Sequence, residues 1–413
     1  MAWPSPRTAA ALVAFGLLSN AALGVAPPAD GPPPAVRSVG KPPTEAECLA
    51  VGEAITKAID EGDIAAFDRA FDWDAVYQST TGGVEAAESF RKGFVEGIEQ
   101  ARRANKGLSA SIIQAVQKGG TYSLLRYHTK EKGPRLLFRL LSPEAGVNYH
   151  DLPLARRADG SVRVVDAYIY LSGEMISQTM RRLYIQGVAK ASGGILNRLT
   201  GEDQRFLKAI GKISEMNEGL RNGKFAEVLA TYKGLDPDFQ KDRSILLIRL
   251  QAAQGLGDDA EYGLSIEDYR TAYPKDACID ILSIDYYTLK KEWPEALACI
   301  ERLDKAVLGD PYLQVMRAGV RTEQGDFAAA RADLDKAEAA EPDLIQSYWT
   351  RISIALKQKD YDETLRVLRL IRDRFQAEFA DLATVPDYKG FTESPQYQQW
   401  LKDLKGDLGK DKE

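Results

Sequence analysis

A spacing of 34 residues in the second half of the chain constrains its fold more than any other feature. Five stations fall at this interval: Phe225, Asp259, Trp293, Phe327 and Tyr361. Three mostly apolar columns follow the stations after three, seven and ten residues: Val228, Tyr262, Ala296, Ala330 and Thr364; Tyr232, Ile266, Ile300, Leu334 and Leu368; Leu235, Tyr269, Leu303, Ala337 and Ile371. Residues spaced in this way share one face of a helix. Recurrence of that face with this period is typical of an array of helix-turn-helix units.

The unit from Asp310 to Asp343 shows the pattern most completely. An apolar helical segment runs into Gly325-Asp326-Phe327, resumes after this turn and stops at Pro342. The helices before the turns carry matching apolar pairs: Ile213 with Met216, Leu247 with Leu250, Ile281 with Ile284, Val315 with Ala318, and Trp349 with Ile352. Each hairpin therefore has apolar residues on two flanks, and it needs neighbouring hairpins to bury both.

Residues 205 to 404 resemble the tetratricopeptide repeat family, most specifically in the unit just described. The resemblance implies an all-α solenoid over residues 200–404, with an inner groove drawn from the first helix of each pair. The last segment, which contains Tyr397 and Trp400, is expected to form a capping helix over the final exposed flank. A charged tail follows at residues 405–413.

The N-terminus has the pattern of a secretory signal peptide over residues 1–24. Arg7 precedes an uncharged stretch, and small residues at Ala22 and Gly24 are placed for cleavage before Val25. The apolar run is about half the ~20 residues that span a bilayer, so a permanent membrane span is not expected. Residues 25–43 are rich in proline and predict an extended linker. We therefore expect an exported protein, either periplasmic or secreted.

Residues 44–195 predict an α+β domain. Helical spacing covers Thr44 to Asp60, Ile64 to Phe71, Gly83 to Arg103 and Met175 to Ala191. Between the third and fourth helices, turn residues separate four or five strands, predicted at Ser109 to Val116, Thr121 to Thr129, Arg135 to Ser142, Val147 to Leu154, and Val162 to Leu171. Such close spacing implies an antiparallel meander.

The order of these elements resembles the cystatin-like roll of the nuclear transport factor 2 superfamily, in which a curved sheet wraps a long helix. The segment from Val164 to Glu174 is also similar to a stretch in uncharacterised bacterial exported proteins with repeat tails. This roll carries both enzymes and pure binding modules, so the resemblance implies no particular activity.

No catalytic motif is present in the sequence. It lacks a zinc-protease helix motif, a nucleophile elbow, a phosphate loop and a cysteine pair at zinc spacing, so we expect no enzyme, no cofactor and no metal site. One alternative stays open: a small-molecule-binding or weakly enzymatic roll with a pocket at His150, Asp151 and Asp166, served by the repeats as a docking arm. By alternation, His128 is expected to share its face with Tyr122, Leu124 and Arg126.

The repeats predict a partner-binding groove. Its exposed lining is expected to include Asn217, Arg221, Gln251, Gln254, Asp285, Thr288, Thr322, Ser353 and Lys357. The charged run Arg331, Asp333, Asp335 and Lys336 is expected on the solvated outer face of a second helix. The formal net charge of -6 argues against nucleic acid as the partner, because phosphate binding uses clustered lysine and arginine. We expect another protein or a peptide in the groove; the partner's identity, the oligomeric state and a bridge between Cys278 and Cys299 stay open.

Overall fold

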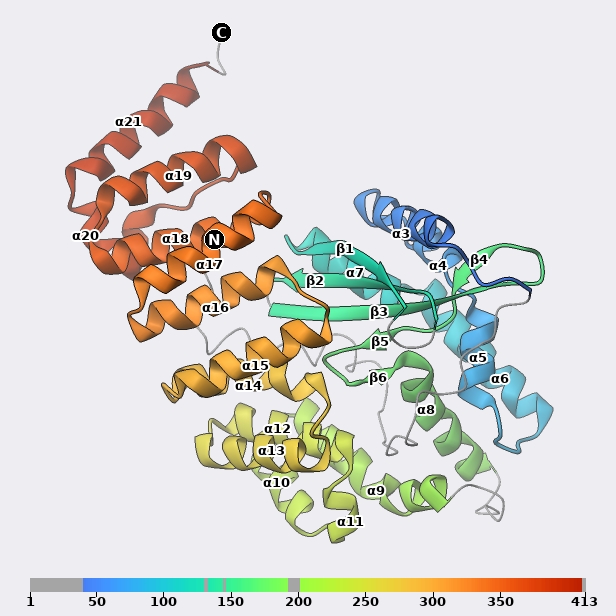
Figure 1. The fold of residues 1–413 in the computed structure, drawn as a ribbon. Coiled ribbons are helices and arrows are strands. Elements are labelled where there is room, and N and C mark those ends of the chain that lie inside the picture. Colours follow the sequence, from blue (N-terminus) through green and yellow to red (C-terminus); the bar gives the residue numbers. More distant parts are fainter. Residues whose placement is uncertain (1–39, 130–132, 144–145, 192–200, 411–413) are drawn as a thin grey trace. The chain divides into compact units, whose positions relative to one another are not determined.

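The structure is a computed structural model, and it describes residues 40–129, 133–143, 146–191 and 201–410. Figure 1 shows its helices and strands. The chain divides into two compact units, with the division between Leu282 and Ser283. Each unit is described by itself. The predicted domain boundary at residues 195–200 lies outside the described residues, and the domain ranges stay predictions.

Helices precede the sheet in the first unit, as predicted. Their bounds are α3 (Glu45–Asp60), α4 (Ile64–Arg69), α5 (Trp73–Thr81), α6 (Glu88–Arg103) and α7 (Leu108–Gln117). Thr44 caps α3, since its hydroxyl accepts from the Glu47 amide while the Glu47 carboxylate accepts from the Thr44 amide. The strand predicted from Ser109 to Val116 is wrong, because this segment forms α7. Helix α5 was not predicted.

The sheet is antiparallel, with the strand order β1-β2-β3-β5-β6 and with β4 paired to β3. The strands are β1 (Thr121–His128), β2 (Arg135–Ser142), β3 (Gly146–Arg156), β4 (Val162–Val164), β5 (Tyr168–Ile169) and β6 (Glu174–Met175). The three long strands confirm the prediction closely. The last predicted strand is broken, because Val165, Asp166 and Ala167 leave the ladder between β4 and β5.

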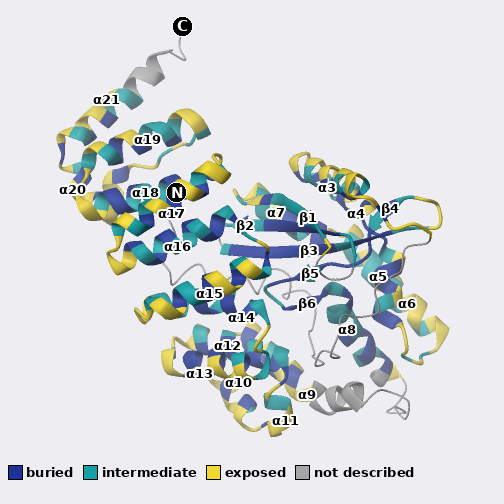
Figure 2. Ribbon diagram, in the orientation of Figure 1, coloured by how far each residue is buried: buried dark blue, intermediate teal, exposed yellow. Residues whose placement is uncertain are grey.

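The core of this region lies between the sheet and α3, α4 and α7. Ile55, Phe67 and Ile113 from these helices join Phe138 and Leu152 from the sheet in one buried cluster. The helices in contact with β1 and β2 are therefore α3 and α7. Helix α6 packs elsewhere, with Phe90 and Phe94 against Tyr184 of α8 (Ile176–Ala191). Figure 2 shows that β2 and β3 are buried along most of their length.

Consecutive packed helices make up the second half of the chain. In the first unit they are α9 (Gly201–Arg221), α10 (Phe225–Lys233), α11 (Pro237–Gln240), α12 (Arg243–Leu256) and α13 (Asp259–Ala272), followed by α14 (Ala277–Leu289), in which the unit division falls. In the second unit they are α15 (Trp293–Ala306), α16 (Pro311–Gln324), α17 (Phe327–Ala340), α18 (Ile345–Gln358), α19 (Tyr361–Phe375), two short 3-10 turns at Leu382–Thr384 and Pro386–Tyr388, α20 (Lys389–Thr392) and α21 (Pro395–Lys410).

The 34-residue period corresponds directly to these helices. All five stations are the first residues of helices: α10, α13, α15, α17 and α19. Every residue in the three apolar columns is buried. The predicted helical hairpin pattern is therefore confirmed at the level of consecutive packed helices with buried, repeating faces.

The turn before each station has the same backbone conformation. The residue two positions before each station has a positive φ: 68° at Gly223, 71° at Gly257, 60° at Lys291, 87° at Gly325 and 57° at Lys359. Only glycine adopts this region without steric cost, so the two lysines are strained there. Helix α21, the last helix in the described residues, places Trp400 in a buried cluster with Leu368 and Ile371 of α19.

Candidate functional site

His150 lies on β3 opposite Phe138 and is fully buried. The hydroxyl oxygen of Tyr122 is 3.1 Å from its Nδ1, and the amide nitrogen of Asn148 is 3.1 Å from its Nε2. The Asn148 amide oxygen accepts from the backbone nitrogens of Tyr149 and Leu171, which fixes the orientation of the amide. Because the amide nitrogen only donates, Nε2 accepts and the neutral ring carries its proton on Nδ1.

Burial lowers the pKa of His150 to about 3, since an imidazolium would lose its hydration there. The ring is therefore neutral at physiological pH. Both of its nitrogens are engaged, and the side chain has no exposure to solvent. These are the properties of a hydrogen-bonded core histidine.

Asp151 faces the opposite side of β3 from His150, because successive side chains alternate along a strand. One carboxylate oxygen lies 3.1 Å from Nε2 of His128, and the other accepts from Nε of Arg135 at 2.7 Å. His128 reaches this face because the register shifts between Leu124 and Arg126. The prediction that His128 shares its face with Tyr122 and Leu124 is therefore wrong: a β-bulge, invisible to simple alternation, reverses the face.

Asp166 belongs to a third network. Its carboxylate accepts from the backbone nitrogens of Ala167 at 2.8 Å and Ser177 at 3.2 Å, and from the Ser177 hydroxyl. Burial raises the pKa of this carboxyl to about 6. Ser177 lies in the first turn of α8, so Asp166 caps that helix from outside it. His150, Asp151 and Asp166 thus occupy separate buried networks, and the structure does not bring them together around an open pocket.

The predicted groove residues differ in exposure. In the first unit, Asn217, Gln251 and Gln254 are half-buried and Arg221 is exposed. In the second unit, Asp285, Thr288 and Ser353 are half-buried, and the exposed Lys357 lies 3.2 Å from a carboxylate oxygen of Glu323. Thr322 differs from the exposed position expected for it. It is buried, and its hydroxyl donates to the Ala318 carbonyl one turn earlier, which satisfies the polar group inside the helix.

Asp333 also differs from expectation. Its side chain is 1% exposed rather than solvated, and it accepts from both Arg317 and Arg321 of α16, at 2.6 Å and 2.5 Å. The spacing of the two arginines, four residues apart on the preceding helix, is the sequence signal that points to a shared acidic partner. A run of mixed charges on α17 does not reveal which of its members turns inward.

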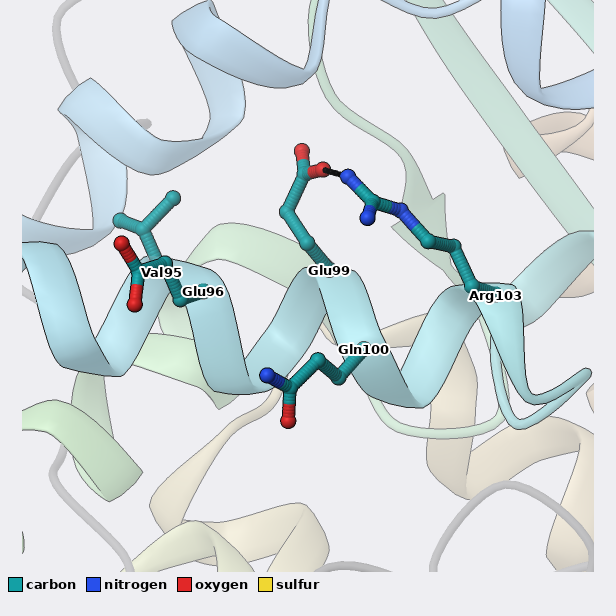
Figure 3. A pocket seen from close by; sticks show the side chains of 5 residues that line it. All are labelled: Val95, Glu96, Glu99, Gln100 and Arg103. Carbon is teal, nitrogen blue, oxygen red and sulfur yellow. Dashed lines mark hydrogen bonds and ion pairs between the residues drawn. The ribbon is translucent and has the colours of Figure 1, made fainter.

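A shallow hollow lies along α6, where Figure 3 shows its lining side chains. Its volume is about 330 Å³, and its lining consists of Val95, Glu96, Glu99, Gln100 and Arg103, all from this one helix. Glu99 and Arg103 form an ion pair at 3.0 Å. The hollow is therefore a surface feature of a single helix, and it gathers no set of groups suited to catalysis.

Three further observations bear on function. Among the residues that the structure describes, no three histidine, cysteine, aspartate or glutamate side chains converge to hold a metal ion. Within the same ranges, no helix is both long and apolar enough to cross a membrane. The three cysteines, Cys48, Cys278 and Cys299, are buried, and no disulfide joins them in the described part of the chain.

No protein-family model, no curated protein and no solved structure matches the chain.

Proposed function

We propose that the chain is a non-catalytic interaction protein whose helical array, of the tetratricopeptide kind, holds another protein or a peptide on the polar face of its first helices. The observation that carries this proposal is a contrast between the two helices of each pair. The three apolar columns that follow the stations are buried, whereas the polar residues Gln251, Gln254, Thr288 and Ser353 on first helices keep part of their surface exposed. Burial of the apolar columns stabilises the packing of the helices against one another. The partly exposed polar side chains are available to contact a partner.

The surroundings of the three predicted pocket residues support a non-catalytic role for the amino-terminal region. A general base must reach its substrate, and His150 is fully buried with both nitrogens engaged. We propose that this region, of the cystatin-like kind, is a rigid mount for the first helices of the array.

We further propose that the protein is exported and acts in the periplasm or outside the cell. The motivation is the pattern of residues 1–24. The test is the mass and N-terminal sequence of the protein recovered from the exported fraction, with Val25 expected as its first residue. Recovery of the full-length chain from the cell interior alone would contradict export.

The interaction is tested by affinity capture with the full chain and two matched variants. In the groove variant, Gln251, Thr288 and Ser353 are each replaced by arginine. In the control variant, the exposed second-helix residues Ala230, Leu264 and Ala328 are each replaced by arginine, so that both carry the same added charge. We expect the native chain and the control to capture the same partner in a fixed ratio, and the groove variant to lose it. Retention of that partner by the groove variant would overturn the proposal.

A further inference from the structure

A cluster of largely buried charged side chains joins the sheet region to the helical array within the first unit. Its members are three carboxylates and two guanidinium groups, those of Glu174, Asp242, Asp276, Arg182 and Arg243. Glu174 lies on β6 and Arg182 on α8, whereas Asp242 and Arg243 stand at the start of α12. The cluster therefore spans the junction between the two regions.

Two ion pairs account for four members of the cluster. Both terminal nitrogens of Arg182 donate to the carboxylate of Glu174. A terminal nitrogen of Arg243 lies 3.0 Å from a carboxylate oxygen of Asp276. Each pair is neutral when both of its members are ionised. The net charge of the cluster is therefore set by the remaining carboxyl group, that of Asp242.

Asp242 forms no ion pair with any residue that the structure describes. Its Oδ1 atom accepts from the backbone nitrogens of Ser244 and Ile245, at 3.0 Å and 3.4 Å. The charged and titratable side chains around it are those of Glu174, Arg182, Arg243, Asp276 and Tyr273. Burial raises the pKa of Tyr273 to about 12, so this phenol is neutral. Ionisation of Asp242 thus leaves one uncompensated negative charge in a buried cluster, which costs free energy.

We propose that this cluster is a pH-sensitive junction, in which a proton on Asp242 holds residues 171–182 against α12 and loss of that proton loosens the contact. The contacts that would be released lie beside the cluster. Arg243 donates to the Gly173 carbonyl, and the Cys278 thiol donates to the Leu171 carbonyl at 3.1 Å. Opening lets water hydrate the ionised carboxylate. Such a junction would set how firmly the array is mounted, whether or not a partner is bound.

The direction of the effect follows from burial. The pKa of Asp242 is raised from 3.8 to about 6 in the folded chain, so the closed junction is favoured in acid and weakened as the pH rises through about 6. If opening restores the ordinary pKa, the open fraction should rise about tenfold between about pH 5 and pH 8.

The test is amide hydrogen exchange of the full chain at these two pH values, with each rate corrected for the intrinsic effect of pH. We expect corrected exchange in both α8 and α12 to be about tenfold faster at the higher pH, and exchange in α3 to stay unchanged. An equal change in α3 would show that the whole unit responds, which would overturn the proposed junction. A change confined to α12 would show fraying of one helix end and would also overturn it.

Two matched variants assign the effect to Asp242. Asp242→Asn keeps a capping side chain and removes the charge, so corrected exchange in α8 and α12 should no longer depend on pH. Asp258→Asn is the control, because Asp258 caps α13 through the Glu261 backbone nitrogen at 3.0 Å and lies outside the cluster. This control should keep the native pH dependence. Retention of that dependence by Asp242→Asn would reject the junction.

Glu174→Gln provides a second, independent variant. It frees Arg182 to pair with Asp242, so that two carboxylates match two guanidinium groups. The pKa of Asp242 should then fall, and the rise in corrected exchange between about pH 5 and pH 8 should disappear. An unchanged rise in Glu174→Gln is sufficient to reject the junction, even if Asp242→Asn fails to fold.

Discussion

Asp333 and Asp335 lie two residues apart on α17 in opposite environments. The Asp333 side chain is 1% exposed and paired with Arg317 and Arg321, whereas the Asp335 side chain is 69% exposed and paired with Arg351. Removing one member of a buried ion cluster leaves uncompensated charge, while exposed ion pairs contribute little. The two aspartates are therefore matched probes of the same helix.

We expect Asp333→Ala to lower the free energy of unfolding by about 3 kcal/mol, because two partly buried arginines lose their shared acceptor. Asp335→Ala should cost less than about 1 kcal/mol. Urea unfolding of both variants measures the difference. Equal losses would show that the buried cluster contributes no more than a surface pair.

The carboxyl group of Asp242 is expected to make the stability of the folded protein depend on pH. It is buried, caps α12 through the backbone nitrogens of Ser244 and Ile245, and faces Arg182 and Glu174. Burial raises the pKa of its carboxyl from 3.8 to about 6. The folded state therefore favours the protonated form. The resulting stabilisation is complete below pH 3.8 and is lost as the pH rises through about 6.

Asp242→Asn keeps a capping side chain and removes the titration. Relative to the native chain, we expect the variant to gain on the order of 2 kcal/mol between about pH 4 and pH 8. Chemical unfolding at both pH values measures the gain, with Asp238→Asn on the exposed face of α11 as the control. A pH-independent difference between variant and native chain would contradict the prediction.

Lys359 is strained by its φ of 57° in the turn that three other units build with glycine. We expect Lys359→Gly to stabilise the protein by about 1 kcal/mol, because glycine adopts this conformation without cost. Lys357→Gly, two residues earlier inside α18, should destabilise it by a similar amount. The thermal unfolding midpoints of the two variants should therefore shift in opposite directions. If both midpoints shift in the same direction, Lys359 is not strained in the native chain.

At the scale of elements, the sequence predicts best where its pattern is long and bounded. The three strands from Thr121 to Arg156 alternate or are continuously apolar between Gly and Pro turns, and the five stations locate helix starts to the residue. The wrong prediction of a strand where α7 forms has a physical cause. Leu108 to Gln117 is a short apolar segment with β-branched residues, which periodicity alone does not assign to a strand or to a buried helix.

The predicted pocket depended on contacts that no local pattern contains. His150 is closed off by Tyr122, which lies 28 residues earlier in the chain, and a one-residue bulge in β1 turns His128 towards Asp151. The position of a residue in the repeat also does not determine its exposure to solvent. Thr322 is buried, although it was expected to line the exposed groove. Spacing predicts the frame of the array, and the access of individual side chains depends on their neighbours in space.

At the scale of the first unit, a turn of the sheet region is joined to the helical array by polar contacts. The turn after β5 reaches α12 and α14, where Arg243 donates to the Gly173 carbonyl and the Cys278 thiol donates to the Leu171 carbonyl at 3.1 Å. Arg243 also pairs with Asp276 at 3.0 Å, and Tyr269 donates to the same carboxylate at 2.6 Å. These contacts, called the seam below, connect the sheet region to the amino-terminal helices of the array within one compact unit.

Gly173 and Gly160 provide a matched test of that seam, because both have a positive φ, 66° and 84°. A Cβ atom on Gly173 would lie 2.6 Å from an Asp276 oxygen and 2.8 Å from an Arg243 nitrogen, while one on Gly160 would meet nothing within 4 Å. Gly160→Ala should therefore cost only the backbone term, about 1 kcal/mol. Gly173→Ala should cost roughly 1–3 kcal/mol more, and only this variant should speed amide hydrogen exchange in α12 and α13, because the clash separates the sheet region from these helices. Equal effects of the two substitutions would mean that the sheet region and the helices hold together without the contacts at this turn.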